Sequence, residues 1–213
     1  MNDQGGSRDS ALTEGLLRAL AALAMAFFVW NVSRHWWADS TRSTLLLLLV
    51  SESFTFALIL FARRALVRDM SPTAMVATLY ALFCLVLLNY DRTRHLAPEW
   101  VAASLQVAGM AWQLAAKATL GRCFGLLPAA RGLVTRGPYR VVRHPIYLGY
   151  LVSHVGFLLG NFSWTNLLVF GALYVAQAVR MLREEAVLSN ADLHGAYAQY
   201  RACVRYRLVP FVY

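Results

Sequence analysis

The chain has 213 residues, of which 59% are hydrophobic and 15% are charged, and its formal net charge is +9. A soluble globular domain of this length would be far more polar, so the composition excludes that class and indicates a membrane protein. The excess of arginine does not indicate a nucleic-acid partner, because no motif that combines aromatic and basic residues accompanies it, and membrane proteins gather positive residues on their cytoplasmic side.

Six apolar runs follow one another along the chain and predict membrane-spanning helices. They cover roughly residues 12–33, 43–62, 72–90, 99–118, 145–160 and 163–180. Several approach the ~20 residues that a helix needs to cross a bilayer. The first run extends to Trp30, with Trp36 and Trp37 beyond it, which favours a retained helix over a cleaved signal peptide. We therefore expect an all-α bundle of six spans, or five if the first run lies along the interface, in one domain over 1–213.

The basic residues predict the orientation of this bundle. With six spans and a cytoplasmic N-terminus, fifteen of the 20 Lys and Arg residues fall in cytoplasmic segments and only four in outer loops. The outer four are Arg34, Arg42, Arg92 and Arg94, and Arg18 lies within the first run. Because loops rich in Lys and Arg stay in the cytoplasm, we expect both termini there, as in a protein of a prokaryotic inner membrane.

Polar residues inside the apolar runs are the first candidates for function. Glu52 lies in the run 43–62, and a carboxylate within a span is costly and marks a functional position unless it is protonated or paired, for instance with Arg18. His154 lies in the middle of the fifth run, where it is either a packing or a functional residue. Lys117, near the cytoplasmic end of the fourth run, is expected to extend its ammonium to the membrane interface. No metal site is predicted, because the spacing of Cys84, Cys123 and Cys203 matches no metal motif.

The last two runs predict an antiparallel helical hairpin, because only residues 161–163 separate them. Small residues share one face of its first helix, and such a face lets membrane helices approach closely. They are Gly149, Ser153, Gly156 and Gly160. The sixth helix is expected to continue past the membrane to about residue 188. The segments 119–143 and 189–213 are expected to be cytoplasmic, and long ordered loops are often functional.

Two motifs flank this hairpin on its cytoplasmic side. The first reads G-P-Y-x-x-x-R-H-P-x-Y-x-G over residues 137–149, and the second reads R-x-x-x-E-E over residues 180–185, followed by Tyr197, Tyr200 and Pro210. Pro145 suits the first turn of a helix, and the free N–H groups of that turn attract anions. Arg143 and this helix end are therefore expected to hold a ligand carboxylate, and Glu184 or Glu185 a ligand ammonium or ribose.

Together, the two motifs resemble the isoprenylcysteine carboxyl methyltransferase family, part of a wider group that includes membrane phospholipid N-methyltransferases and bacterial thiol methyltransferases. The likeness covers about residues 117–213, within a methyltransferase-like half at 99–213, whereas the N-terminal helices of 1–98 match nothing specific. It implies S-adenosyl-L-methionine as cofactor at the cytoplasmic side and a lipid-like or small-molecule acceptor that enters from the membrane. It assigns catalytic roles to Arg143, Glu184 and Glu185. The residues it assigns to cofactor binding are Gly137, Tyr139, His144, Pro145, Tyr147, Gly149, Glu184, Glu185, Tyr197 and Tyr200.

The sequence leaves the acceptor open, and it leaves rival functions. An isoprenoid carboxylate is the acceptor that the resemblance implies first, with a phospholipid amine or a small thiol as alternatives. Membrane sterol reductases, which use NADPH, have a similar C-terminal end, but Pro145 and the Glu184-Glu185 pair favour methyl transfer. A non-catalytic scaffold would be expected to carry a damaged motif, and this motif is intact. Arg143 alone could be a charge anchor, Arg180 and Glu184 a helix-surface pair, and the two tail tyrosines membrane-interface residues.

Overall fold

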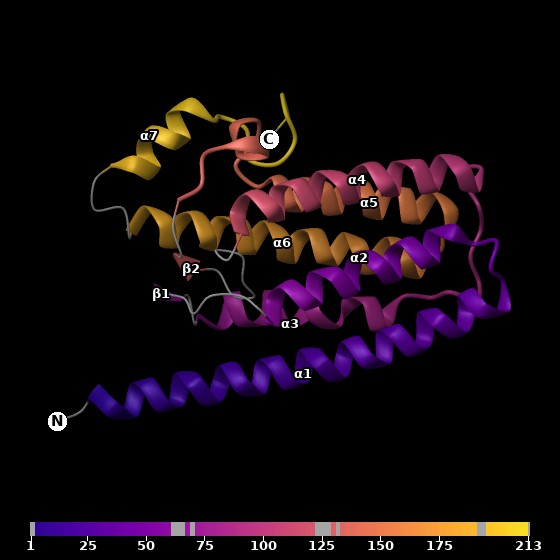
Figure 1. Ribbon diagram of the computed structural model, residues 1–213, viewed down its shortest axis with the longest axis horizontal. Helices are drawn as coiled ribbons and strands as arrows, with labels where there is room; N and C mark the ends of the chain where they lie inside the picture. The colour runs from indigo at the N-terminus through magenta and orange to yellow at the C-terminus, as the bar shows by residue number, and fades with distance from the viewer. Residues whose placement is uncertain are drawn as a thin grey trace.

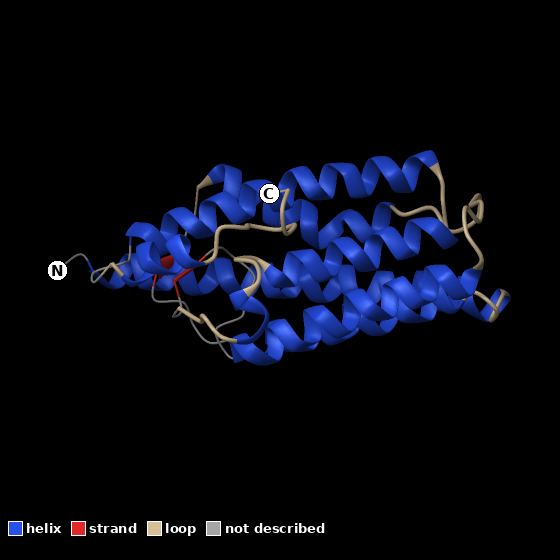
Figure 2. Ribbon diagram, turned by 90° about the horizontal axis from the view of Figure 1, so that it is seen from above, coloured by secondary structure: helices blue, strands red, loops and turns tan. Residues whose placement is uncertain are grey.

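The computed structural model describes residues 3–60, 67–68, 71–121, 129–130, 133–190 and 195–212. Its main helices are α1 (Asp3–Ala38), α2 (Ser43–Leu60), α3 (Pro72–Phe83), α4 (Glu99–Leu120), α5 (Pro145–Gly160), α6 (Trp164–Asn190) and α7 (Ala196–Cys203). Two short 3₁₀ helices are η1 (Cys84–Leu87) and η3 (Gly137–Arg140), and β1 (Val67–Arg68) pairs with β2 (Ala129–Ala130) in an antiparallel two-stranded sheet. The molecule is an elongated helical bundle with its linkers at the two ends (Figures 1 and 2), which confirms the all-α class.

Each of the six apolar runs forms a helix, α1 to α6. Among the described residues, α6 alone is both long and apolar enough to cross a membrane by itself. Shorter apolar helical segments cover Ser43–Ala57, Pro72–Leu87 and Pro145–Gly160. As expected, α6 continues beyond its apolar part, to Asn190.

The tightest helix contact joins α4 and α5. A Cβ added to Gly109 would lie 2.6 Å from the carbonyl oxygen of Gly149 and would also meet the backbone of Ser153. The small face of α5 therefore packs backbone to backbone against α4. The hairpin partner α6 instead meets α5 through large side chains, among them His154 and Phe170, whose ring centroids are 4.4 Å apart.

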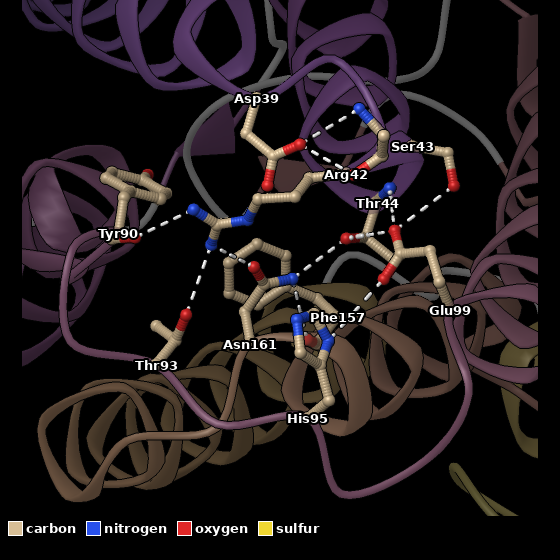
Figure 3. Close-up of polar contacts among 11 residues, drawn as sticks. Asp39, Arg42, Ser43, Thr44, Tyr90, Thr93, His95, Glu99, Phe157 and Asn161 are labelled. Atoms are coloured by element: carbon tan, nitrogen blue, oxygen red, sulfur yellow. Dashed lines mark hydrogen bonds and ion pairs between the residues drawn. The ribbon is translucent and has the colours of Figure 1, made fainter.

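A polar network fastens the linkers at the end of the bundle where α5 gives way to α6 (Figure 3). Arg42 donates hydrogen bonds to the Tyr90 carbonyl (2.9 Å) and to the Asn161 side chain. Asn161 Nδ2 donates to Thr44 Oγ1 (2.9 Å), and the Glu99 carboxylate accepts from the Thr44 N–H (2.8 Å). These bonds tie the start of α2 to the start of α4 and to the 161–163 link, so this end is fixed by the protein's own groups.

Candidate functional site

The two sequence motifs meet at the opposite end of the bundle, where α5 begins and α6 ends, beside α7 and the C-terminal tail (Figure 1). His144, the residue before α5, places its Nε2 3.2 Å from Oε1 of Glu185 on α6, and Glu185 is 5% exposed. The hairpin thus brings the Arg-His-Pro motif and the paired acids together, as the sequence predicts.

Glu185 is the centre of this site, because three basic side chains converge on its carboxylate. Besides His144, Arg143 Nη1 lies 3.0 Å from Oε1, and Arg207 Nε donates to Oε2 at 3.2 Å. Arg207 belongs to the tail and was not among the residues predicted for the site. Only its place in an arginine-rich segment could have suggested it.

The tail is held against the Arg-His-Pro motif by backbone hydrogen bonds. The N–H of Arg143 donates to the Tyr206 carbonyl and that of His144 to the Arg207 carbonyl, each at 2.9 Å. Arg143 Nη2 also donates to the Arg205 carbonyl at 3.2 Å. The tail therefore forms one wall of the site, and Arg143 is oriented by both α6 and the tail.

These contacts change the acidity of Glu185. Burial by itself raises the pKa of this carboxyl, but the hydrogen bond from His144 and the electrostatic effects of His144, Arg143 and Arg207 outweigh it and hold the pKa below its ordinary value. Glu185 is therefore ionised near neutral pH. Burial also raises the pKa of the nearby Tyr197 to about 12, so that phenol stays protonated.

Glu184 precedes Glu185 in the sequence, but its contacts differ from those of Glu185. It is half-buried and forms no hydrogen bond or ion pair with any residue that the structure describes. Arg180, which the sequence offered as its helix-surface partner, donates to Gln177 Oε1 (3.2 Å) and lies 5.8 Å from the centre of the Tyr147 ring. Glu184 is thus the carboxylate of the pair that can receive a ligand.

The residues predicted for the site in η3 and α7 contact each other. Tyr200 on α7 donates its hydroxyl proton to the Tyr139 carbonyl at 2.8 Å, which joins α7 to η3. Gly137 has a φ of +60°, which favours glycine, and a Cβ there would meet Thr119. Tyr197 and Tyr200 are buried, with ring centroids 6.2 Å apart.

Two further predicted residues contribute to the start and the packing of α5. Pro145 is the buried first residue of α5, as expected for a proline that starts a helix. Gly149 lies in the α4–α5 contact, where a Cβ would come 2.6 Å from Gln113 Cβ. The structure thus gives Gly149 a role in helix packing.

The interior polar residues differ from the sequence expectation at one position. Lys117 does not extend to the interface, since it is 2% exposed and donates to Thr55 Oγ1 (2.6 Å) and Gln113 Oε1 (2.8 Å). Partners on α2 and α4 itself hold the ammonium inside the bundle. His154 is buried, and its Nδ1 lies 2.8 Å from the Tyr174 hydroxyl.

The structure combines a helical hairpin, which brings the Arg-His-Pro motif next to the paired acids, with a tyrosine-rich tail. This is the arrangement that the sequence associated with membrane methyltransferases. The phospholipid methyltransferase family model matches residues 99–191, from the first residue of α4 to just past the end of α6. No curated protein matches the chain. The family match confirms that the resemblance is to the membrane methyltransferase group that holds both the isoprenylcysteine carboxyl and the phospholipid enzymes.

The residues present fit the cofactor that this group implies. The Nε of Arg143 is buried and has no hydrogen-bond partner among the described residues, so a ligand carboxylate there would satisfy it. The Glu184 carboxylate is open to an ammonium or hydroxyl group. Tyr147 already has the Arg180 guanidinium near its ring, which is the kind of contact that a positive sulfonium also makes.

Proposed function

We propose that this protein is an integral membrane methyltransferase that uses S-adenosyl-L-methionine, with six spans and with both termini and the cofactor site in the cytoplasm. The observation that carries the proposal is that two charged side chains with unused bonding capacity lie where the two motifs meet. Among the residues that the structure describes, the buried Nε of Arg143 has no hydrogen-bond partner, and Glu184 forms no hydrogen bond or ion pair. One cationic and one anionic contact match the amino-acid end of this cofactor, which carries a carboxylate and an ammonium.

Each residue of the site has a distinct part in this proposal. Arg143 binds the cofactor carboxylate, and Glu184 binds its ammonium or ribose. Glu185 orients Arg143 and, through Arg207, holds the tail in place. When bound, the cofactor would supply an electrophilic methyl group on a positive sulfur, and the Tyr147 ring would accommodate that charge. The buried tyrosines of α7 exclude water from the site.

Two lipid-like acceptors suit this cofactor site. The motif resemblance points to an isoprenoid carboxylate, and the family match points to a phospholipid amine. Methyl transfer by direct displacement requires mainly that the donor and acceptor be aligned. The site residues between 137 and 207 therefore do not discriminate between the two candidate acceptors. The acceptor enters from the membrane in both cases.

Calorimetry on the detergent-solubilised protein tests the proposal. We expect binding of both S-adenosylmethionine and its demethylated product, S-adenosylhomocysteine, and no binding of NADPH. A Glu184→Gln variant should weaken binding of both by about tenfold, the effect of losing roughly 1.4 kcal/mol. Binding of NADPH with neither methionine derivative would replace the methyltransferase by a reductase.

A further inference from the structure

A group of exposed arginines lies at the site end of the bundle, on the segments that enclose the candidate site. The segments 133–143 and 196–212 together contain six arginines and no acidic residue. Two of them, Arg143 and Arg207, turn inward to Glu185. The other four are exposed, namely Arg136, Arg140, Arg201 and Arg205. Among the residues that the structure describes, no acidic side chain forms an ion pair with these four, so the fold leaves their charges available to a partner.

Hydrogen bonds bring the two arginine-bearing segments together. The Tyr200 hydroxyl on α7 donates to the Tyr139 carbonyl on η3, and an exposed arginine directly follows each of these tyrosines. Further along both segments, Arg143 Nη2 donates to the Arg205 carbonyl. The exposed arginines of η3 and of the tail therefore lie at the same end of the molecule, close to one another.

The tail adds apolar side chains to this charged group. Phe211 and Val212 are 87% and 80% exposed. They belong to an ordered turn, because the Val212 N–H donates to the Val209 carbonyl (3.1 Å) and the Phe211 ring lies 5.1 Å from that of Tyr206. Phe211 has a φ of +66°, which a bulky residue rarely adopts. We call Phe211, Val212 and the four exposed arginines the interface patch.

The interface patch lies where a membrane surface is expected. Only residues 141–144 separate η3 from the apolar helix α5, and the His144 N–H holds the tail there through the Arg207 carbonyl. Arginines grouped directly beside a membrane helix are attracted to anionic head groups, and apolar residues among them enter the boundary between head groups and acyl chains. A soluble anion would account for the arginines but not for Phe211 and Val212.

We propose that the interface patch docks onto anionic lipid of the cytoplasmic leaflet and that this docking holds the tail closed on the cofactor site. The patch and the site share the same short segment, because the carbonyls of Tyr206 and Arg207 accept the Arg143 and His144 N–H groups, and Arg207 also binds Glu185. A partner that binds the tail only in its closed position shifts the tail toward that position. The effect on the cofactor rests on the proposed function, whereas the docking itself has its own readout.

Fluorescence of the full-length protein in lipid nanodiscs tests the docking. The native cysteines Cys84, Cys123 and Cys203 are replaced by alanine, and Val212→Cys carries a nitrobenzoxadiazole fluorophore, whose emission shifts to the blue when it enters a membrane. We expect a larger shift in nanodiscs of phosphatidylcholine with phosphatidylglycerol than in nanodiscs of phosphatidylcholine alone. An equal shift in the two lipids would overturn the proposal.

Two matched double variants show whether the interface patch causes this difference. Arg201→Gln with Arg205→Gln removes two charges of the patch and keeps the backbone carbonyl that Arg143 uses, so the shift should fall to its value in phosphatidylcholine alone. Arg92→Gln with Arg94→Gln removes two exposed charges at the far end and should leave the shift at the wild-type value. An unchanged shift in the first double variant would overturn the proposal.

Binding of S-adenosylhomocysteine in the same two kinds of nanodisc tests the effect on the site. We expect about fivefold tighter binding by the wild type in the anionic nanodiscs, the effect of roughly one arginine at an anionic surface. The first double variant should lose this increase, and the far-end variant should keep it. Equal affinity of the wild type in both lipids would overturn the closure of the tail by docking. Absence of binding in either lipid would instead reject the proposed function, while the fluorescence would still decide the docking.

Discussion

Glu185 and Arg143 depend on each other more than a surface pair does, because both are nearly enclosed and each has further partners. Glu185 receives three basic groups, and the two terminal nitrogens of Arg143 reach different partners, the Glu185 carboxylate and the Arg205 carbonyl. Removing one member of a buried pair costs about 3–5 kcal/mol, whereas an exposed pair contributes under ~1 kcal/mol. The two residues therefore belong to one unit of the site.

We expect Glu185→Gln and Arg143→Ala to abolish turnover while the helical bundle stays folded. The reason is that either change leaves the partner charge uncompensated and releases the tail from the Arg-His-Pro motif. Arg143→Lys should also be poor, because a single ammonium cannot reach two partners as a planar guanidinium does. Turnover and the melting temperature in detergent are measured together for each variant.

Arg183→Ala is the matched control for this pair. Arg183 lies on the same helix, but its hydrogen bond to Thr73 Oγ1 (2.7 Å) is exposed, so its loss should have a mild effect. Near-normal rates in Glu185→Gln and Arg143→Ala would make them structural anchors and not site residues. If a variant loses both turnover and folded protein, binding of S-adenosylhomocysteine by the purified variant decides whether the residue acts in the site or only in folding.

Single residues differ in how far the sequence could predict their surroundings. The meeting of His144 with Glu185 follows from a short link between two helices of known length, so it was predictable. Arg207 was not, because nothing in helix periodicity gives the path of a tail after α7. The prediction for Lys117 was wrong because its partner Thr55 lies on another helix, and sequence spacing contains no information on that contact.

The α4–α5 contact is the element-scale feature that the structure defines most sharply. Gly109→Ala would place a Cβ against the backbone of Gly149 and Ser153, and backbone atoms cannot move aside as a flexible side chain can. Overpacking of this kind typically costs about 1–3 kcal/mol. We expect a lower melting temperature by tryptophan fluorescence in detergent.

Gly171→Ala provides the control for this substitution within α6. Nothing lies within 4 Å of a Cβ at Gly171, and alanine favours a helix over glycine by up to about 1 kcal/mol. The control should therefore melt at or slightly above the wild-type temperature. Equal melting of the two variants would show that α4 and α5 are not in backbone contact.

For whole helices, the sequence predicts where each helix lies along the chain, but it is less informative about which helix packs against which. Each apolar run became a helix, because length and hydrophobicity suffice to predict one. The small residues of α5 indicated that some helix approaches closely, but residue size does not say which one. The structure shows it to be α4, through Gly109, and not the hairpin partner α6.

The candidate site and a second polar network lie at opposite ends of the molecule. The start of α1, the end of α6 and α7 lie at one end, with the Arg-His-Pro motif (Figure 1). The network of Arg42, Asn161 and Glu99 closes the other end (Figure 3). An even number of passes follows if α1 to α6 each cross the membrane, which agrees with the excess of basic residues predicted for the cytoplasm.

Cysteine labelling of intact cells tests this arrangement in the full chain. Cys203 on α7 is exposed, whereas Cys84 is buried, so we take a background in which Cys84 and Cys123 are alanine. We expect a membrane-impermeant maleimide to label Cys203 only after the cells are lysed, because the proposed orientation places the site end in the cytoplasm. In the same background with Cys203 also replaced by alanine, Arg92→Cys, an exposed position at the far end, should be labelled without lysis.

A reporter fused at Met1 should be cytoplasmic as well. A Met1 reporter on the side opposite Cys203 would mean five crossings, with α1 along the interface, and labelling of Cys203 in intact cells would reverse the bundle and place the proposed cofactor site away from the cytoplasmic supply of S-adenosylmethionine.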